Sequence, residues 1–450
     1  MSIFLVKQLY LKNKMQIVKK NIYIPIEIYF RELIPRLYFS SKAIKKNYRI
    51  YIGTKHGIDK ILQKKKSLKS HGGIYFNKGI FIANKKYLEK IKDICDNFVV
   101  MDEELGPSIP SQSTAVVNRC VFDSSIKKFF TVGKNWKKNI LQHDKRFKPI
   151  VVNTGWPRYD LLNDKKVVFY LNEAKKIKKK YGKFHLFSSN YGTLSYEGLA
   201  ERMRIIKKDH TKSFCIKKKK IFKNNISDFN EFIKELNFYY ANKGKNKIII
   251  RPHPSEFYHE DWARSTRNIS KNISVIYKGD VIPWIMASEG LIHRGCGTAI
   301  DGYILKKNVF YFQSKRKLNK EEKNLTFKVS RVINNLIEIE NKTPHLMQKY
   351  NAIKDDIQNY NNKNSSNKIL NEINKLKTQK EYPIKADTKI LLFYFFIKRL
   401  LKSIFIKNES TKMPLNIKVK DVKYFFNNIK NNDSIKIKKI NSEAIEIDSI

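Results

Sequence analysis

The strongest constraint on the fold is an alternation of short apolar runs and helix-spaced segments, which occurs twice along the chain. In the first half, the runs that we predict to be strands are Ile22–Ile26, Arg49–Gly53, Phe98–Met101, Phe129–Val132 and Ile150–Val152. In the second half they are His185–Ser188, Lys247–Ile250, Ile273–Ile276, Gly290–Ile292 and Val309–Phe312. Strands that alternate with helices are typical of a parallel sheet covered on both faces. We therefore predict an α/β protein with two Rossmann-like domains facing a cleft, followed by a helical C-terminal extension.

The domain boundaries follow from where this alternation starts, pauses and stops. We predict a basic leader at 1–20, a first Rossmann-like domain at 21–165, a second at 183–325, a helical extension at 326–407 and a low-complexity tail at 408–450. The segment Ile390–Ile406 is dense in Leu, Ile and Phe but carries Lys398, Arg399 and Lys402. This pattern fits either a membrane-interfacial helix or a core helix docked on the second domain.

The charge and cysteine content narrow the partners and the compartment. There are 91 Lys and Arg against 41 Asp and Glu, a net charge of +50, which favours polyanions such as nucleic acid, anionic lipid or nucleotide-linked substrates. Abundant Lys, Asn and Ile are also typical of an A/T-rich genome, which accounts for part of this charge. The four cysteines fit neither a metal site nor a disulfide framework. With no apolar run of about 18 residues, we expect a protein that is either free in the cytoplasm or peripheral on the inner membrane.

Three adjacent carboxylates, Asp102, Glu103 and Glu104, directly follow the predicted strand Phe98–Met101. In open α/β sheets, ligands bind at the carboxyl ends of the strands. Like charges this close raise the pKa of at least one acid, as a general base for a sugar hydroxyl requires. A solvated acidic loop is the alternative interpretation. Earlier in the chain, Glu27 and Arg31 fit either acceptor contacts or a structural ion pair.

Polar turns also follow predicted strands of the second half. Arg251, His253 and Pro254 lie in the sequence Arg-Pro-His-Pro, where the prolines fix the backbone and the two basic side chains suit a phosphate. A rigid turn with a capping histidine is the competing interpretation.

Two further turns of the second half, and one in the first, complete the candidate site. The predicted nucleotide contacts there are Ser188, Ser189, Asn190, Gly295, Gly297 and Thr298. The last three open a helix and predict an anion site built from backbone N–H groups, with tight packing of the turn as the alternative. No base stands beside Cys296, so we do not expect a cysteine nucleophile. Arg158, after Gly155 and Pro157, fits an acceptor contact or a hinge.

Taken in order, these motifs resemble the bacterial surface carbohydrate (polysaccharide) biosynthesis protein family. The resemblance covers about residues 21–315. It rests on Ile24–Glu27 with Arg31-Glu32, Asp102–Glu104, Thr154–Leu162, Ser188–Asn190, Arg251–Glu256, and Pro283-Trp284 with Ile292–Asp301. That family looks like the GT-B glycosyltransferases that use CMP-activated sugars, including bacterial sialyltransferases and β-Kdo transferases. The resemblance implies that Glu103 or Glu104 is the base and that His253-Pro254 contacts the CMP. This chain departs from the pattern where Leu105 separates the acids from Gly106, and where Gly295-Cys296 replaces an Asn-containing turn.

The leading prediction is therefore an inverting glycosyltransferase of lipopolysaccharide O-antigen or capsule synthesis. We expect it to take a nucleotide-sugar donor, with CMP as the favoured nucleotide, and a glycan or lipid-linked acceptor, with no metal or other cofactor. The first alternative is a polyol-phosphate transferase of the teichoic-acid type, with a CDP-linked donor. A non-catalytic polyanion-binding or nucleic-acid-binding protein has only the charge in its favour, and we expect no specific nucleic acid. A catalytically dead scaffold is the last alternative.

Overall fold

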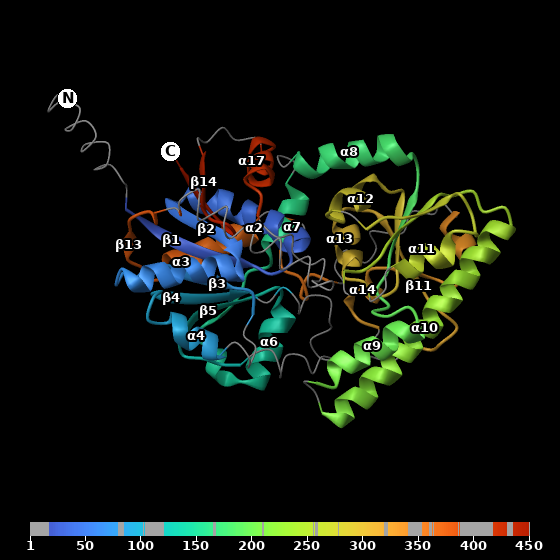
Figure 1. The fold of residues 1–450 in the computed structure, drawn as a ribbon, viewed down its shortest axis with the longest axis horizontal. Helices are drawn as coiled ribbons and strands as arrows, with labels where there is room; N and C mark the ends of the chain where they lie inside the picture. The colour runs from blue at the N-terminus through green and yellow to red at the C-terminus, as the bar shows by residue number, and fades with distance from the viewer. Residues whose placement is uncertain are drawn as a thin grey trace. The chain divides into compact units, whose positions relative to one another are not determined.

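The computed structural model describes residues 18–79, 85–101, 103, 121–164, 168–208, 211–254, 256, 260–277, 279–318, 323–340, 353–359, 362, 364–385, 387, 417–429 and 435–449. The chain divides into two compact units. Unit 1 comprises Met1–Glu103, Thr114–Leu161 and Lys363–Ile450, and unit 2 comprises Glu104–Ser113 and Leu162–Asn362. Figure 1 shows both as α/β units.

Unit 1 is built on a parallel sheet whose strands run in the order β2-β1-β3-β4-β5-β6. The strands are β1 (Lys19–Ile26), β2 (Tyr48–Thr54), β3 (Ile74–Asn77), β4 (Asn97–Met101), β5 (Ile126–Thr131) and β6 (Val151–Asn153). The helices are α2 (Tyr29–Ile44), α3 (Lys55–Ser67), α4 (Lys85–Ile91), α6 (Lys134–His143) and α7 (Pro157–Asn163), with a 3-10 turn η3 (Lys145–Phe147). The strand order reverses direction between β1 and β3, so the loops after these two strands flank a topological switch point.

The C-terminal part of the chain returns to unit 1 and extends its sheet. A hairpin of β14 (Ile435–Asn441) and β15 (Ala444–Ser449) pairs antiparallel with β2 through β15, and β13 (Lys380–Glu381) pairs antiparallel with β1. Two helices, α15 (Ser365–Asn374) and α17 (Val419–Asn427), contact α2. Figure 1 shows these orange and red elements beside the blue strands.

These contacts correct two predicted boundaries. The tail predicted at 408–450 is wrong where the structure describes it, because Ile445 and Ile447 are buried in the sheet. The helical extension predicted at 326–407 is divided, since its described residues up to 362 belong to unit 2 and those from 364 onward to unit 1. The segment Ile390–Ile406, with Lys398, Arg399 and Lys402, lies outside the described residues.

Unit 2 has six parallel strands in the order β12-β11-β10-β7-β8-β9. They are β7 (His185–Ser188), β8 (Ile248–Arg251), β9 (Ile273–Val275), β10 (Gly290–His293), β11 (Asn308–Phe312) and β12 (Arg331–Ile333). Numbered within the unit, this is the 3-2-1-4-5-6 order of dinucleotide-binding Rossmann domains, with its switch point between β7 and β10. The prediction of two Rossmann-like α/β domains is confirmed, while the predicted cleft between them stays a prediction.

The helices of unit 2 surround a core rich in aromatic side chains. They are α8 (Phe169–Tyr181), α9 (Tyr196–Ile206), α10 (Lys212–Ala241), α11 (Glu260–Thr266), α12 (Ile282–Ala287), α13 (Thr298–Ile304) and α14 (Leu325–Lys328), with a 3-10 segment η4 (Leu336–Glu340). Phe187 of β7 stacks on Phe232 of α10 at 4.0 Å between ring centroids, and Trp262 packs against both. Helix α8 precedes residue 183 and contacts α12, so unit 2 begins earlier than the predicted boundary at residue 183. Among the described residues, no helix has the length and apolar character to cross a membrane.

Candidate functional site

The predicted nucleotide-binding residues of unit 2 converge at the switch point of its sheet. In the strand register Ser188, the last residue of β7, stands between Arg251 of β8 and His293 of β10. The loops that follow these three strands therefore leave the same edge of the sheet. Asn190 spans the switch point, because its side-chain Nδ2 donates to the carbonyl oxygen of Gly295 at 3.0 Å.

A buried carboxylate, Glu256, fixes the loop after β8 against the loop after β7. Its oxygens accept hydrogen bonds from Ser189 Oγ at 2.7 Å, the Tyr191 N–H at 2.8 Å, Trp262 Nε1 at 3.0 Å and the His253 N–H at 3.2 Å. Burial raises the pKa of Glu256, and the four donated bonds oppose that rise. The His253 N–H also donates to Ser189 Oγ at 2.9 Å, so the predicted turn is held by hydrogen bonds within its own loop and to the loop after β7.

Glu256 is the functional residue that sequence reasoning missed, although it belongs to the quoted segment Arg251–Glu256. A glutamate three residues after His253 gives no sign in the sequence that it is buried. Its partners lie in other loops, and a single sequence does not reveal that contact. The glutamate shapes the turn that presents His253 and Pro254. The side chain of His253 is partly exposed, and that of Pro254 is exposed.

Arg251 places positive charge at this edge of the sheet. Its Nη2 donates to the carbonyl oxygen of Gly279 at 2.8 Å, and its guanidinium lies over the ring of Trp284 at 5.2 Å. Burial lowers the pKa of Arg251 to about 10, while nearby Asp280 opposes that shift. Because this pKa is still well above 7, the side chain is a cation at neutral pH, as a phosphate contact requires.

His293 and Arg294 support the turn after β10. Ser330 Oγ donates to the carbonyl oxygen of Thr326, so it accepts from His293 Nε2, while His293 Nδ1 accepts the Gly295 N–H. The imidazole is therefore neutral, and burial lowers the pKa of His293 to about 3. Arg294 forms a buried ion pair with Asp228, which also accepts from Ser314 Oγ at 2.6 Å.

The glycine turn itself offers less than the sequence indicated. Gly295 has a φ of +71°, which only glycine adopts without strain, and no described atom lies within 4 Å of the position that a Cβ would take. Gly297 precedes α13, which has only seven residues and therefore a small dipole. Burial raises the pKa of the Cys296 thiol, which disfavours the thiolate form.

Two hydroxyls among the predicted nucleotide contacts, those of Ser188 and Thr298, make no hydrogen bond with the described residues. Ser188 Oγ is buried at the switch point itself. Buried polar atoms in native proteins almost always have a partner, so this atom suits a hydrogen bond to a bound ligand or a water molecule.

In unit 1, the predicted acceptor-side residues belong to an ion-pair cluster at the β1/β3 switch point. Lys78, which follows β3, contacts Glu27 Oε2 at 2.7 Å and Glu32 Oε1 at 3.0 Å. Arg31 contacts Glu32 at 3.4 Å, and the Glu27 N–H donates to Glu32 at 2.8 Å. Burial raises the pKa of Glu32, but the charges of Lys78 and Arg31 and these hydrogen bonds outweigh burial and lower it overall. Lys78 was not predicted, and only its place after an apolar strand could have indicated it.

Of the three predicted catalytic acids, the structure describes only Glu103. Its Oε1 lies 3.5 Å from Nη2 of the buried Arg36, whose guanidinium lies 4.6 Å from the centre of the Phe76 ring. Arg36 Nε and Nη1 make no hydrogen bond within the described residues. Glu103 Oε1 likewise makes no hydrogen bond with the described residues, so the contact with Arg36 is an ion pair without a hydrogen bond. Asp102, Glu104, Leu105 and Gly106 lie outside the described residues.

Arg158 lies near the same region of unit 1. Its Nη1 donates to the carbonyl oxygen of Arg31 at 3.3 Å, which leaves open both predicted roles, acceptor contact and hinge. The nearby Asp160 is buried and accepts the N–H groups of Ser365 and Ser366 at 2.9 and 2.6 Å, so it caps the start of α15. No group of three or more His, Cys, Asp or Glu side chains suited to a metal ion occurs among the described residues.

Comparison with known proteins gives structural likenesses only. Neither a protein-family model nor a curated protein sequence matches this chain. The UDP-GlcNAc 2-epimerase of Methanocaldococcus jannaschii aligns with 14% identity and a TM-score of 0.47 over 79% of this chain and 99% of that one. The wall teichoic acid polymerase TagF aligns with 13% identity and a TM-score of 0.47, over 82% and 95%. The UDP-GlcNAc 2-epimerase of Neisseria meningitidis gives 13% and 0.46, over 80% and 100%. With TM-scores below 0.5, these likenesses do not establish a function.

Proposed function

We propose that this protein is a glycosyltransferase of bacterial surface polysaccharide synthesis and that unit 2 binds its nucleotide-sugar donor. One observation carries the proposal. Three predicted loops meet at the β7/β10 switch point of a sheet with the dinucleotide-binding strand order. Arg251 supplies a cation there, Ser188 an unpaired hydroxyl, and Glu256 holds the turn of His253 in place. This combination of rigid loops, positive charge and available donors suits a sugar nucleotide.

The donor that we favour carries a single phosphate, as a CMP-sugar does. Arg251 ends β8 and His253 lies two residues further on, so we expect both side chains to act on one phosphate group. Hydrogen bonds from these side chains would stabilise the negative charge that the phosphate gains when the bond to the sugar breaks. A CDP-linked donor of the polyol-phosphate type would use the same loops, so nucleotide preference distinguishes the two.

We propose that unit 1 supplies the acceptor side. Glu103, or its neighbours Asp102 and Glu104, would take the proton of an acceptor hydroxyl. The hydroxyl oxygen would then attack the anomeric carbon, the bond from that carbon to the phosphate oxygen would break, and the nucleotide would leave with the electron pair, with inversion. Arg36 forms an ion pair with Glu103. Glu27, Arg31 and Arg158 would contact a glycan or lipid-linked acceptor on the cytoplasmic side of the membrane.

Titration calorimetry with CMP, CDP, UMP and UDP tests this proposal. We expect selective CMP binding by the wild type, lost in His253→Ala and retained in His143→Ala, an exposed histidine of unit 1. We also expect Glu103→Gln to retain CMP binding and to lose sugar transfer. A preference for CDP would favour the polyol-phosphate transferase. No nucleotide binding at all would contradict the proposal.

A further inference from the structure

The first half of α10 and the whole of α9 stand apart from the main core of unit 2. The second half of α10 contributes Phe229, Phe232 and Leu236 to that core. The first half packs instead on α9, in a separate small cluster of Leu199, Met203, Cys215, Phe222 and Ile226. We call residues 196–223 the α9–α10 hairpin, and Figure 1 shows its two helices side by side.

The α9–α10 hairpin exposes an unusual concentration of large apolar side chains. Five of the thirteen exposed large hydrophobic residues in the described part of the chain lie in these 28 positions: Tyr196, Ile205, Phe214, Ile216 and Ile221. Tyr196 and Ile216 are 62% and 63% exposed. Single exposed apolar residues need no explanation, but this density of exposed apolar side chains on two packed helices suits a surface that binds something apolar.

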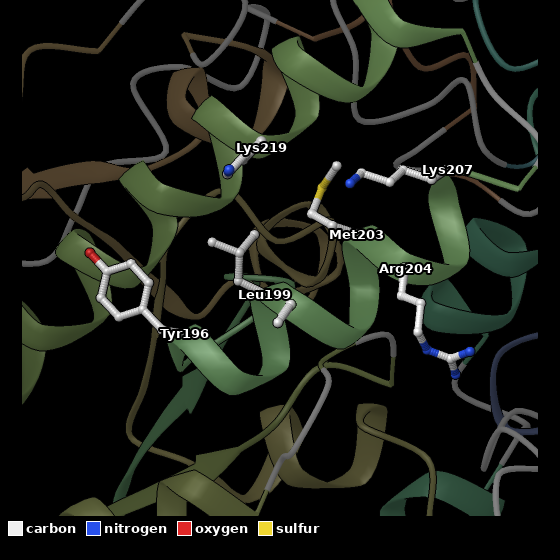
Figure 2. Close-up of a pocket in the computed structure, with 7 residues that line it drawn as sticks. Tyr196, Leu199, Met203, Arg204, Lys207 and Lys219 are labelled. Carbon is white, nitrogen blue, oxygen red and sulfur yellow. The ribbon is translucent and has the colours of Figure 1, made fainter.

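The same hairpin is strongly basic. Residues 196–223 contain ten Lys and Arg against three Asp and Glu, which gives a net charge of +7. A hollow of about 430 Å³ between the two helices combines both properties. Figure 2 shows Arg204 and Lys207 from α9 and Lys219 from α10 around Leu199 and Met203. Long basic side chains beside apolar ones match an anionic headgroup above an acyl chain.

Two hydrogen bonds tie α9 and α10 to the candidate nucleotide site. Arg202 Nη1 donates to the carbonyl oxygen of Gly192 at 2.8 Å, and Asn225 Nδ2 donates to that of Tyr191 at 2.6 Å. Both carbonyls belong to the loop after β7, which also carries Ser189 and Asn190. The helices that would carry a bound partner are therefore in direct contact with the loop that we assign to the donor.

We infer that the α9–α10 hairpin binds the surface of an anionic lipid membrane. Exposed apolar side chains favour a membrane over a nucleic acid, which the basic residues alone would also attract. This inference goes beyond the proposed function and rests on different residues. It gives unit 2 a membrane contact in described residues, separate from the segment Ile390–Ile406.

Co-sedimentation of the full-length protein with vesicles tests the inference. The vesicles contain phosphatidylcholine with or without 30% phosphatidylglycerol, the percentage being about that of an anionic bacterial-type surface. One variant reverses three hairpin charges (Lys207→Glu, Lys219→Glu, Lys220→Glu), and its control reverses three exposed lysines elsewhere in unit 2 (Lys234→Glu, Lys245→Glu, Lys271→Glu). A second variant removes apolar groups (Ile205→Ser, Ile216→Ser), with Phe238→Ser and Ile337→Ser as its control.

We expect the wild type and both controls to bind the anionic vesicles and not the neutral ones. The hairpin charge variant should bind roughly a hundredfold more weakly, since each basic residue near such a surface adds about a factor of five. The apolar variant should also lose binding. The inference would be overturned if the wild type did not bind the vesicles, or if variants and controls lost binding equally. It would also be overturned if the hairpin charge variant lost binding to RNA in a parallel measurement but still bound the vesicles.

The outcome is distinguishable from that of the proposed function. CMP titration of the same proteins reports on the switch point alone. Retained CMP binding without vesicle binding contradicts only the membrane contact, whereas vesicle binding by a wild type that binds no nucleotide contradicts only the proposed glycosyltransferase.

Discussion

Replacement of Glu256 by glutamine tests how the candidate nucleotide site is held together. Every partner of this carboxylate is a donor: Ser189 Oγ, His253 N and Trp262 Nε1 contact one oxygen, and Tyr191 N contacts the other. A glutamine has only one acceptor oxygen, because its other terminal atom is an NH₂ donor. In its more favourable orientation, the amide oxygen of the glutamine accepts the three bonds from Ser189, His253 and Trp262. Its NH₂ group then faces the Tyr191 N–H, which is also a donor.

The expected loss of stability follows from this geometry. The buried Tyr191 N–H is left without an acceptor, at a cost of about 1–3 kcal/mol. The other three bonds lose their charge assistance, which weakens each by roughly 1 kcal/mol. Because a buried charge is also removed, part of this loss is offset. We expect Glu256→Gln to lower the free energy of unfolding by about 3 kcal/mol and to weaken CMP binding by at least about tenfold.

Urea unfolding and CMP titration measure both effects. Glu289→Gln is the matched control, since Glu289 pairs with Lys178 on the surface and both side chains are about half exposed. Exposed ion pairs contribute about 0–1 kcal/mol, so this control should unfold near the wild type. If Glu256→Gln unfolds at the same urea concentration as Glu289→Gln and binds CMP normally, Glu256 does not organise the turn.

Three further substitutions test the ion pairs and the neutral histidine. Glu32→Gln should destabilise the protein at pH 7 and match the wild type at low pH. The reason is that the pKa of Glu32 is lowered in the folded protein from its ordinary value of 4.5. The charged carboxylate therefore stabilises the fold above pH 4.5, and this contribution disappears as the pH falls through the native pKa. Between pH 6.5 and about 3, His293 is protonated in the unfolded protein but not in the native one, so the wild type loses stability as the pH falls. His293→Gln should reduce this loss, and an unchanged pH profile of thermal unfolding would refute the prediction. Asp448→Asn should cost about 3–5 kcal/mol in urea unfolding, since it breaks buried pairs with Lys19 at 2.6 Å and Arg49 at 2.9 Å, and a loss below about 1 kcal/mol would contradict that account.

The sequence predicted the sheet of unit 2 well because its strands are short, apolar and bounded by polar turns. Val309–Phe312, for example, is buried and falls within β11. The C-terminal hairpin was missed because β14 and β15 alternate isoleucine with lysine and glutamate, a pattern that resembles low complexity. The start of α10 at Lys212 is difficult to recognise in the sequence, because the run of four lysines at 217–220 obscures the apolar positions that pack on α9.

The candidate site was predictable where residues follow strands and unpredictable where they act through long-range contacts. Ser188, Arg251 and the turn at Gly295 meet because parallel strands end at one edge of a sheet. Glu256 and Lys78 depend on partners in other loops, and no local pattern indicates such contacts.

The most direct test of the central claim is amide hydrogen exchange of the full-length protein with and without CMP. The account predicts that CMP slows exchange in the loops after β7, β8 and β10, at residues 188–195, 251–256 and 293–298, and leaves the C-terminal hairpin of unit 1 unchanged. Protection confined to other segments, or no protection at saturating CMP, would contradict a nucleotide site at the switch point of unit 2.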